Sequence, residues 1–214
     1  MRRHAAFEEY ILRTVMLLMA VKNRHPCTIA QGCSLGAFHA ANLAFRHPHL
    51  FHKLAAFSGR YDLTLNVDGF RDLFDGYRDE QFYFNTPLQF LPNLICPRRL
   101  DALRRMDIVL LIGREDPFLD NNRHLSGILW SKGVGHVLHE WDGRAHQGSY
   151  WRWRAPSLRL IPRAAACAGP FAKERTMREA PQWGLRFPVG VPVLGHPTTR
   201  IRVSDRPEAV SQRT

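Results

Sequence analysis

The chain has 214 residues, which is long enough for one domain with a hydrophobic core and an additional tail. Hydrophobic residues make up 45% and charged residues 23%, ordinary proportions that exclude a chain too polar to form a core. The net charge of +11 is uneven, because residues 151–214 contain 12 Lys and Arg against 4 Asp and Glu. The basic character therefore says little about the rest of the chain.

Hydrophobic periodicity predicts alternating helices and strands over the first two thirds of the chain. Apolar residues recur at three- and four-residue spacing in three segments, which predicts helices over residues 5–22, 35–46 and 118–132. Short apolar runs predict four strands, over residues 27–31, 53–58, 107–113 and 136–141. Strands that alternate with helices are typical of an α/β fold, with a mostly parallel sheet of about four strands flanked by helices.

Residues 59–97 are rich in aromatic side chains that follow no single period. Two interpretations remain open for this segment. It forms a loop or small cap over a site, or its aromatic residues belong to ordinary surface packing.

The composition changes near residue 154. Residues 151–214 hold 8 of the 14 prolines at irregular positions. We therefore expect a partial α/β domain over residues 1–154 and a Pro/Arg-rich tail over residues 155–214, which is disordered or arises from a change of reading frame near residues 152–155. The tail has no aromatic interleaving and no Arg-Gly repeat, so no nucleic-acid partner is expected. Binding of nucleic acid through its basic residues is the lowest-ranked alternative function.

The N-terminal region carries no clear targeting signal. The apolar stretch from Val15 to Val21 is too short to span a bilayer, follows charged residues and lacks a small-residue cleavage site. We therefore expect a cytoplasmic protein without a membrane span. The four cysteines show no C-x-x-C spacing, so no metal site is expected either.

The most informative motif is Gly32-Cys33-Ser34-Leu35-Gly36, between a predicted strand and a predicted helix. A G-x-S-x-G turn in this context is typical of a nucleophile elbow, which exposes the serine hydroxyl at the end of a sheet. Gly32 and Gly36 would let the strand and the helix approach closely. The amide of Leu35 would then face a developing oxyanion. Cys33 is an alternative nucleophile whose side chain is expected to point into the core, and a chance match of the pattern is the alternative interpretation.

A serine nucleophile needs a base, and the base needs an orienting acid. Asp116 directly follows the strongest late strand, and Pro117 restricts its backbone to an extended form, so Asp116 is the candidate acid. Glu115 is its nearest competitor. His146 lies in the loop after the last predicted strand and is the candidate base. Three other histidines are expected to serve packing or the surface: His124, His136 and His139.

With these residues in this order, the sequence resembles the α/β-hydrolase fold esterases, in particular bacterial esterases related to esterase D and the mycolyltransferases. The resemblance covers roughly residues 4–153, and segments that carry it include GCSLGAFHAAN at 32–42, SGRYDL at 58–63 and YFNTP at 83–87. It implies serine ester hydrolysis with Ser34 as nucleophile, His146 as base and Asp116 as acid. It also implies no metal and no organic cofactor.

The sequence departs from that family at both ends. A complete α/β-hydrolase places several strands before the elbow, whereas only one helix is predicted here, so we expect an N-terminally truncated chain. The loop that supplies a second oxyanion amide would then be missing, and the nucleophile strand would have an unpaired apolar edge. The expected partner is a second copy of this chain, which would pair through this edge to form a homo-oligomer. After the candidate base, Arg154-Ala155-Pro156 interrupts the tryptophan-rich helix of the family.

The leading functional hypothesis is a serine ester hydrolase of the carboxylesterase type that acts on a small-molecule ester. Transfer of the acyl group to an acceptor other than water would use the same residues. The alternative is a catalytically inactive hydrolase-like fragment that acts only through assembly.

Overall fold

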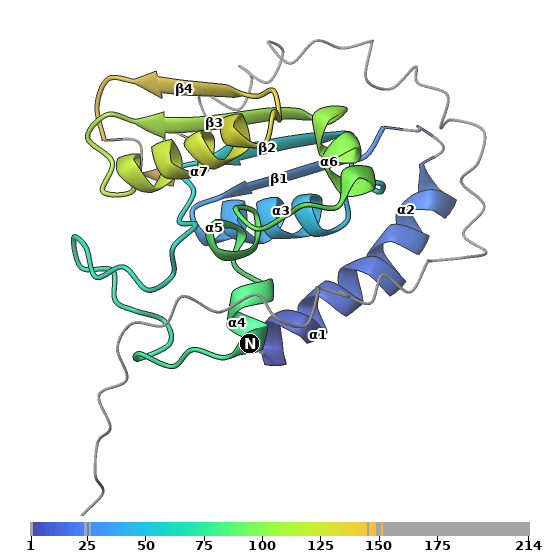
Figure 1. The fold of residues 1–214 in the computed structure, drawn as a ribbon, viewed down its shortest axis with the longest axis horizontal. Helices are drawn as coiled ribbons and strands as arrows, with labels where there is room; N and C mark the ends of the chain where they lie inside the picture. The colour runs from blue at the N-terminus through green and yellow to red at the C-terminus, as the bar shows by residue number, and fades with distance from the viewer. Residues whose placement is uncertain (1, 24, 26, 145, 149–150, 152–214) are drawn as a thin grey trace, which may run out of the picture. The chain divides into compact units, whose positions relative to one another are not determined.

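A computed structural model describes residues 2–23, 25, 27–144, 146–148 and 151. The expected tail and the expected domain boundary at residue 154 lie outside these residues. Within them, four strands form one sheet in the order β1-β2-β3-β4, and every neighbouring pair is parallel (Figure 1). The strands are β1 (Ile29–Cys33), β2 (Lys53–Phe57), β3 (Asp107–Gly113) and β4 (Val137–Trp141). The predicted fold class is confirmed, and β1 begins two residues later than predicted.

The helices on either side of the strands agree with the predicted segments. α3 (Leu35–Arg46) matches its prediction, and α7 (Leu119–Ser131) is one residue shorter at each end. Periodicity predicts none of three further helices between β2 and β3, which are α4 (Glu80–Phe84), α5 (Pro87–Phe90) and α6 (Pro97–Arg104). α5 and α6 begin at a proline, whose fixed φ suits the first helical position. A proline at the first position is a helix signal that does not depend on the spacing of apolar residues, so periodicity alone does not find these helices.

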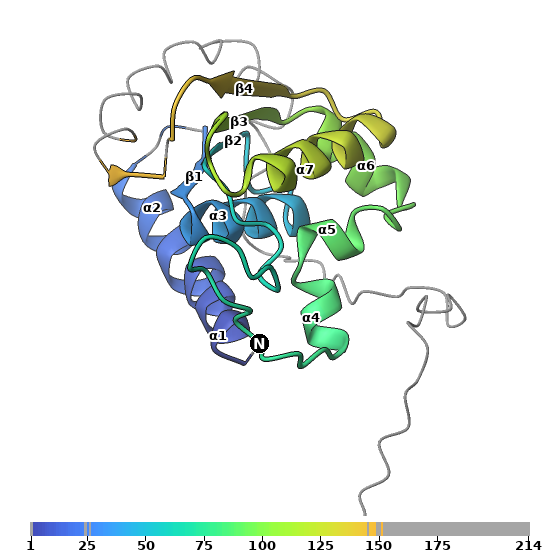
Figure 2. The ribbon, with the colours of Figure 1, turned by 90° about the vertical axis from the view of Figure 1, so that its left-hand side faces the viewer.

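One face of the sheet is covered by α3 and α7, which lie side by side beneath it (Figure 2). Alternate residues of the two central strands point to this face, and they join the apolar side chains of both helices in the main core: Leu54, Ala56, Ile108 and Leu110. The opposite face carries a smaller cluster of Ala55, Phe57 and Leu111. All five residues of β2 are buried, because this strand lies inside the sheet and is covered on both faces.

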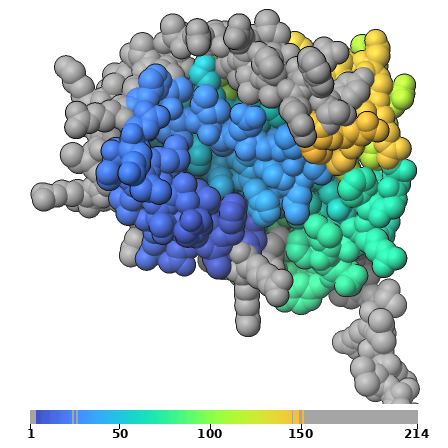
Figure 3. Space-filling view, turned by 180° about the vertical axis from the view of Figure 1, so that it is seen from behind, coloured from blue at the N-terminus to red at the C-terminus, as the bar shows by residue number. Residues whose placement is uncertain are grey.

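The N-terminal helix is continuous across a π-helical turn, with the parts α1 (Arg2–Tyr10), η1 (Ile11–Val15) and α2 (Met16–Lys22). It lies at the surface, dark blue in Figure 3, and several of its apolar side chains are exposed: Phe7, Tyr10, Leu17, Leu18 and Met19. The apolar stripe of this helix is therefore only partly its packing face, since Ile11 packs against the main core whereas Phe7, Tyr10, Leu18 and Met19 are exposed. None of the described helices is long and apolar enough to cross a membrane.

Polar contacts attach this helix to α3. The buried carboxylate of Glu8 accepts hydrogen bonds from Arg46 and, at 2.5 Å, from His47. The Nδ1 atoms of His4 and His39 lie 3.1 Å apart, and the His4 Nε2 lies 2.7 Å from the side-chain amide nitrogen of Asn42. Burial, with a smaller contribution from the His39 charge, lowers the pKa of His4 to about 4. The hydrogen bonds of His4 therefore require it to be neutral.

β1 is a terminal strand of this sheet, because it pairs with β2 and with no other strand among the described residues. Ile29 on this strand is 50% exposed. The open edge expected for the strand before Ser34 is thus present in the described part of the chain. Association of two copies through it stays a prediction.

Acidification is expected to weaken the attachment of the N-terminal helix. Since the pKa of His4 falls from 6.5 in the unfolded chain to about 4 in the folded one, the unfolded state binds more protons between these values. Stability is therefore fully present above about pH 6.5 and decreases as the pH falls toward about 4. The free energy of unfolding, measured by urea denaturation between these pH values, should depend less on pH in His4→Gln than in the unchanged chain. An equally weakened dependence in His124→Gln, at an exposed position of α7, would contradict this assignment.

A charge on the open edge should oppose association through β1. Ile29→Lys is expected to lower the concentration-dependent mass in light scattering toward the monomer value, because lysine on an edge strand disfavours pairing with another chain. Val137→Lys is the matched control, since Val137 is 45% exposed on β4, the other terminal strand of the sheet. An equal effect of both variants, or a chain that is monomeric at every concentration, would exclude this edge as the interface.

Candidate active site

The turn from β1 into α3 is sharp and strained at Ser34. Ser34 has φ 54° and ψ −118°, in a region that L-residues rarely adopt. A Cβ atom built at Gly32 would lie 2.1 Å from the carbonyl oxygen of Gly36, so only glycine fits there. A Cβ at Gly36 would meet no atom within 4 Å. The expected crowding is therefore confirmed at Gly32 and wrong at Gly36.

A chain of hydrogen bonds begins at the Ser34 hydroxyl. The Oγ of Ser34 lies 2.8 Å from Nε2 of His146, and Nδ1 of His146 lies 3.2 Å from Oδ2 of Asp116. The three residues follow β1, β4 and β3, whose carboxyl ends meet at one edge because the strands are parallel. The side chain of His146 is 9% exposed and that of Asp116 is 0% exposed. The structure thus brings together the three residues that the sequence singles out.

The position of Asp116 suits an orienting acid. Its Oδ1 accepts a hydrogen bond of 3.0 Å from the backbone N–H of Phe118, which leaves Oδ2 for the imidazole. The competing carboxylate, Glu115, is exposed. A neutral His146 that donates from Nδ1 to Asp116 can accept the Ser34 proton at Nε2.

The other candidates of the motif lie as follows. Leu35 is the first residue of α3, and its N–H is one of those that have no acceptor within a helix. Cys33 packs against the smaller cluster of the sheet, and burial raises the pKa of its thiol. A buried thiol with a raised pKa is a poor nucleophile.

The remaining histidine candidates do not reach Ser34. His136 lies just before β4, where its Nε2 is 2.7 Å from the hydroxyl of Ser126, and burial lowers its pKa. His124 and His139 are exposed. In the described part of the chain, no group of three or more His, Cys, Asp or Glu side chains could hold a metal ion.

Three aromatic rings surround the His146 imidazole. Their centroids lie 5.2, 5.5 and 5.4 Å from that of His146, for Phe70, Phe118 and Trp151 respectively. The Trp151 Nε1 also lies 3.3 Å from the hydroxyl of Ser58, to which it donates. The rings restrict the imidazole, whose side chain is only 9% exposed.

None of these rings is predicted individually as a site residue, although Phe70 lies in the aromatic segment 59–97, for which a cap over a site is one of the two interpretations. Two of these rings are close in the sequence to candidate site residues, since Phe118 is two residues after Asp116 and Trp151 is five residues after His146. That proximity is the sequence signal that could have identified them.

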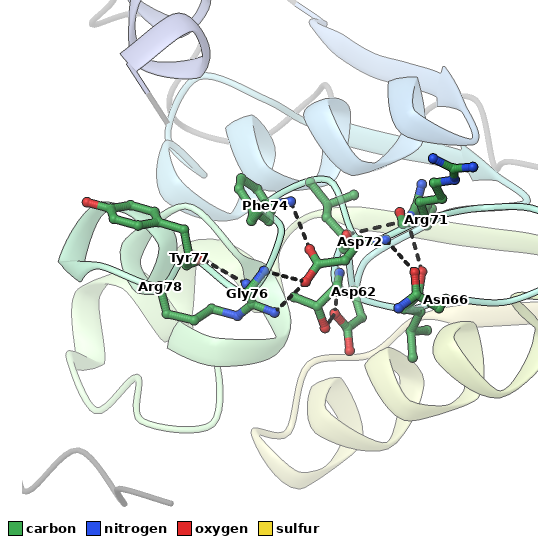
Figure 4. Close-up of polar contacts among 12 residues, drawn as sticks. Asp62, Asn66, Arg71, Asp72, Phe74, Gly76, Tyr77 and Arg78 are labelled. Atoms are coloured by element: carbon green, nitrogen blue, oxygen red, sulfur yellow. Dashed lines mark hydrogen bonds and ion pairs between the residues drawn. The ribbon is translucent and has the colours of Figure 1, made fainter. Parts of the chain in front are cut away.

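The segment that supplies Phe70 contains a repeat, Asp-Gly-Phe-Arg-Asp at 68–72 and Asp-Gly-Tyr-Arg-Asp at 75–79. The Asp-Gly pair has positive φ in both copies, 50° and 82° in the first and 47° and 79° in the second, as in type I′ turns. The carboxylate of Asp72 accepts hydrogen bonds from the backbone of Phe74 and Gly76 and from the Arg78 side chain (Figure 4). This loop is internally ordered, and at Phe70 it lies over the candidate site.

Neither family models nor curated proteins match the sequence, but solved structures do. A ferulic acid esterase superposes with a TM-score of 0.57 at 19% identity, covering 73% of this chain and 59% of that one. The fluorophosphonate-binding serine hydrolase FphF of Staphylococcus aureus gives 0.54 at 15%, covering 72% and 61%. An S-formylglutathione hydrolase from Agrobacterium tumefaciens gives 0.55 at 16%, covering 72% and 55%. This chain has the α/β-hydrolase fold.

These structures confirm the resemblance inferred from the sequence as far as the fold is concerned. Sequence identities of 15–19% show a shared fold and no more. The chain spans 55–61% of the length of these three proteins. Within the α/β-hydrolase fold, the turn from β1 to α3 and the loops after β3 and β4 all lie at the carboxyl edge of the sheet.

The two glycines of the turn should respond differently to the same substitution. Gly32→Ala is expected to destabilise the fold by about 3 kcal/mol or more, because a methyl group there collides with backbone rather than with a mobile side chain. Gly36→Ala is the matched control and should leave stability unchanged or raise it by up to about 1 kcal/mol, since alanine favours a helix. Chemical denaturation measures both, and equal costs would contradict the structure of this turn.

Proposed function

We propose that the chain is a serine ester hydrolase with Ser34 as nucleophile, His146 as general base and Asp116 as orienting acid. The observation that supports this most is the chain of contacts from Ser34 Oγ to His146 Nε2, at 2.8 Å, and from His146 Nδ1 to Asp116, at 3.2 Å. Hydrogen bonds of this kind let an imidazole accept the hydroxyl proton while a carboxylate holds its tautomer. The strained Ser34 backbone is a second support, because strain of this kind clusters at active sites.

In the proposed reaction, Ser34 Oγ bonds to the acyl carbon of the ester while its proton passes to Nε2 of His146. The carbonyl oxygen becomes an oxyanion, which accepts a hydrogen bond from the N–H of Leu35. The C–O bond to the alcohol then breaks, and the alcohol leaves with the proton from Nε2. Water repeats the sequence on the acyl-enzyme, and an acceptor other than water would give acyl transfer. Asp116 stabilises the imidazolium at both stages.

The proposed substrate class is a small-molecule carboxylic ester. The similar structures are a ferulic acid esterase, a fluorophosphonate-binding serine hydrolase and an S-formylglutathione hydrolase. The esterase supports an ester as substrate, and the serine hydrolase supports a serine as nucleophile. A fluorophosphonate therefore suits the test, because it reacts with an activated serine without requiring that the natural ester be known.

A second candidate function is that of an inactive hydrolase-like chain that acts through assembly. The open edge of β1 in the described structure favours it. The strand that leads into Ser34 is the same terminal strand β1, so both candidates concern one element.

Fluorophosphonate labelling of the folded chain distinguishes the two candidates. We expect labelling that disappears in Ser34→Ala and His146→Ala, because the hydroxyl is lost in one and its proton acceptor in the other. Asp116→Asn is expected to lower the rate by about 10³- to 10⁴-fold, since it disturbs the histidine tautomer.

Two variants serve as controls in the same assay. Glu115→Gln should label at the unchanged rate because Glu115 is exposed beside the acid, and Cys33→Ala should do so because the thiol is not the nucleophile. Labelling that survives in Ser34→Ala would refute the assigned nucleophile. A folded chain that shows no labelling would favour the inactive candidate.

A further inference from the structure

Arg60 is a buried cation close to the candidate nucleophile that the proposed mechanism leaves without a role. It follows Ser58 and Gly59 at the end of β2, and its backbone N–H lies 3.4 Å from the carbonyl oxygen of Ser34. The residue is only 5% exposed. A buried charge is costly unless it is compensated, so the groups around the guanidinium indicate what it does.

One nitrogen of the guanidinium gathers three backbone carbonyls from the loop that follows. The Nη2 of Arg60 donates to the carbonyl oxygens of Leu63, at 3.4 Å, of Leu65, at 3.1 Å, and of Arg71. Arg71, in the loop shown in Figure 4, directly follows Phe70 in the chain. The charge of Arg60 therefore fixes the path of residues 63–71 at both ends.

The same guanidinium lies against two of the rings that surround the imidazole. Its Cζ is 5.5 Å from the ring centroid of Phe70 and 5.5 Å from that of Phe118. Both rings contact His146, with centroid distances of 5.2 and 5.5 Å. Arg60 is thus attracted to the aromatic groups that restrict the proposed base.

A second tie joins this loop to the loop of the base. Asp68, two residues before Phe70, forms an ion pair with Arg144, two residues before His146. The pair is partly exposed, so its own energy is small. The pair joins the loop that carries Phe70 to the loop that carries His146. Arg60 holds the first of these loops through its hydrogen bonds to backbone carbonyls.

Within the described residues, the hydrogen bonds of the Arg60 guanidinium go to backbone carbonyls of the loop that follows it. Its Nε is buried without a hydrogen-bond partner in the described structure, and its Nη2 is committed to carbonyls. Burial lowers the pKa of Arg60, and the charges of Asp62 and Asp72 oppose this shift. The hydrogen bonds of these two carboxylates go to other groups, since Asp62 accepts from Thr64 and Asp72 accepts from Arg78 and the backbone of its own loop.

We propose that Arg60 is a positioning residue for the base, holding residues 63–71 so that Phe70 keeps the His146 imidazole within reach of Ser34. The inference rests on the proposed function, because it assigns to His146 the role of general base. It gives the loop at 63–71 a purpose beyond covering the site.

The test compares Arg60→Met, Arg60→Lys and Arg78→Met in fluorophosphonate labelling over a range of probe concentrations. Arg60→Met removes every donor, and it should lower the labelling rate at saturating probe by about 10- to 100-fold, the cost of a displaced catalytic group. The half-saturating probe concentration should stay unchanged. Arg60→Lys should restore most of the rate, because one ammonium nitrogen carries three donors for the three carbonyls.

Arg78→Met is the matched control. Arg78 also donates to a backbone carbonyl and to the Asp72 carboxylate, and it lies over two rings, 4.7 Å from the centroid of Phe82 on α4 and 6.0 Å from that of Phe74. Neither ring contacts His146 in the described structure. It should label at the unchanged rate. An unchanged rate in Arg60→Met, an equal loss in Arg78→Met or a loss explained by a raised half-saturating concentration would each overturn the proposal.

Two further measurements keep the proposal testable. Should Arg60→Met fail to fold, Phe70→Leu removes the ring while leaving the bonds of Arg60, and it should lower the saturating rate in the same way. Amide hydrogen exchange is independent of activity, and it should accelerate over residues 63–71 in Arg60→Met but not in Arg78→Met. If the unchanged chain does not label, the proposed function fails, whereas unchanged exchange in Arg60→Met refutes the anchor itself.

Discussion

The strained backbone at Ser34 is the constraint on which the arrangement of the site depends. With φ 54° and ψ −118°, the chain leaves β1 and enters α3 within one residue, and the side chain projects from the turn rather than packing beside it. The turn closes because Gly32 has no side chain against the Gly36 carbonyl. Burial of the apolar face of α3 against the central strands offsets the cost, since strain persists only where surrounding structure enforces it.

The sequence predicts much of this because the relevant signals are local. Four apolar runs, with a helical period between the first two and between the last two, favour a parallel sheet, and parallel strands bring their carboxyl ends together. Asp116 and His146 could be selected from chain order alone, since each follows a strand, and Asp116 is now distinguished from Glu115 by burial. Strand order alone thus identifies Asp116 and His146 as candidates, without any knowledge of side-chain contacts.

What the sequence does not reveal comes from contacts between distant segments. The N-terminal helix has the spacing of an amphipathic helix, yet it is attached through Glu8 and His4 to partners on α3 that periodicity does not identify. The aromatic rings around His146 come from three segments far apart in the sequence, and a count of aromatic residues cannot say which of them meet. Arg60 resembles any surface arginine until its three carbonyl acceptors are seen.

The two candidate functions converge on β1. Ser34 is held on one side by β2, through the bond from its N–H to the Phe57 carbonyl at 2.9 Å, while the other side of the strand is open in the described structure. A chain that paired with this edge would add backbone hydrogen bonds to the strand that leads into the strained turn, and would restrict its motion. Assembly and catalysis are therefore not exclusive alternatives, because the strand that exposes an edge for pairing is also the support of the serine hydroxyl.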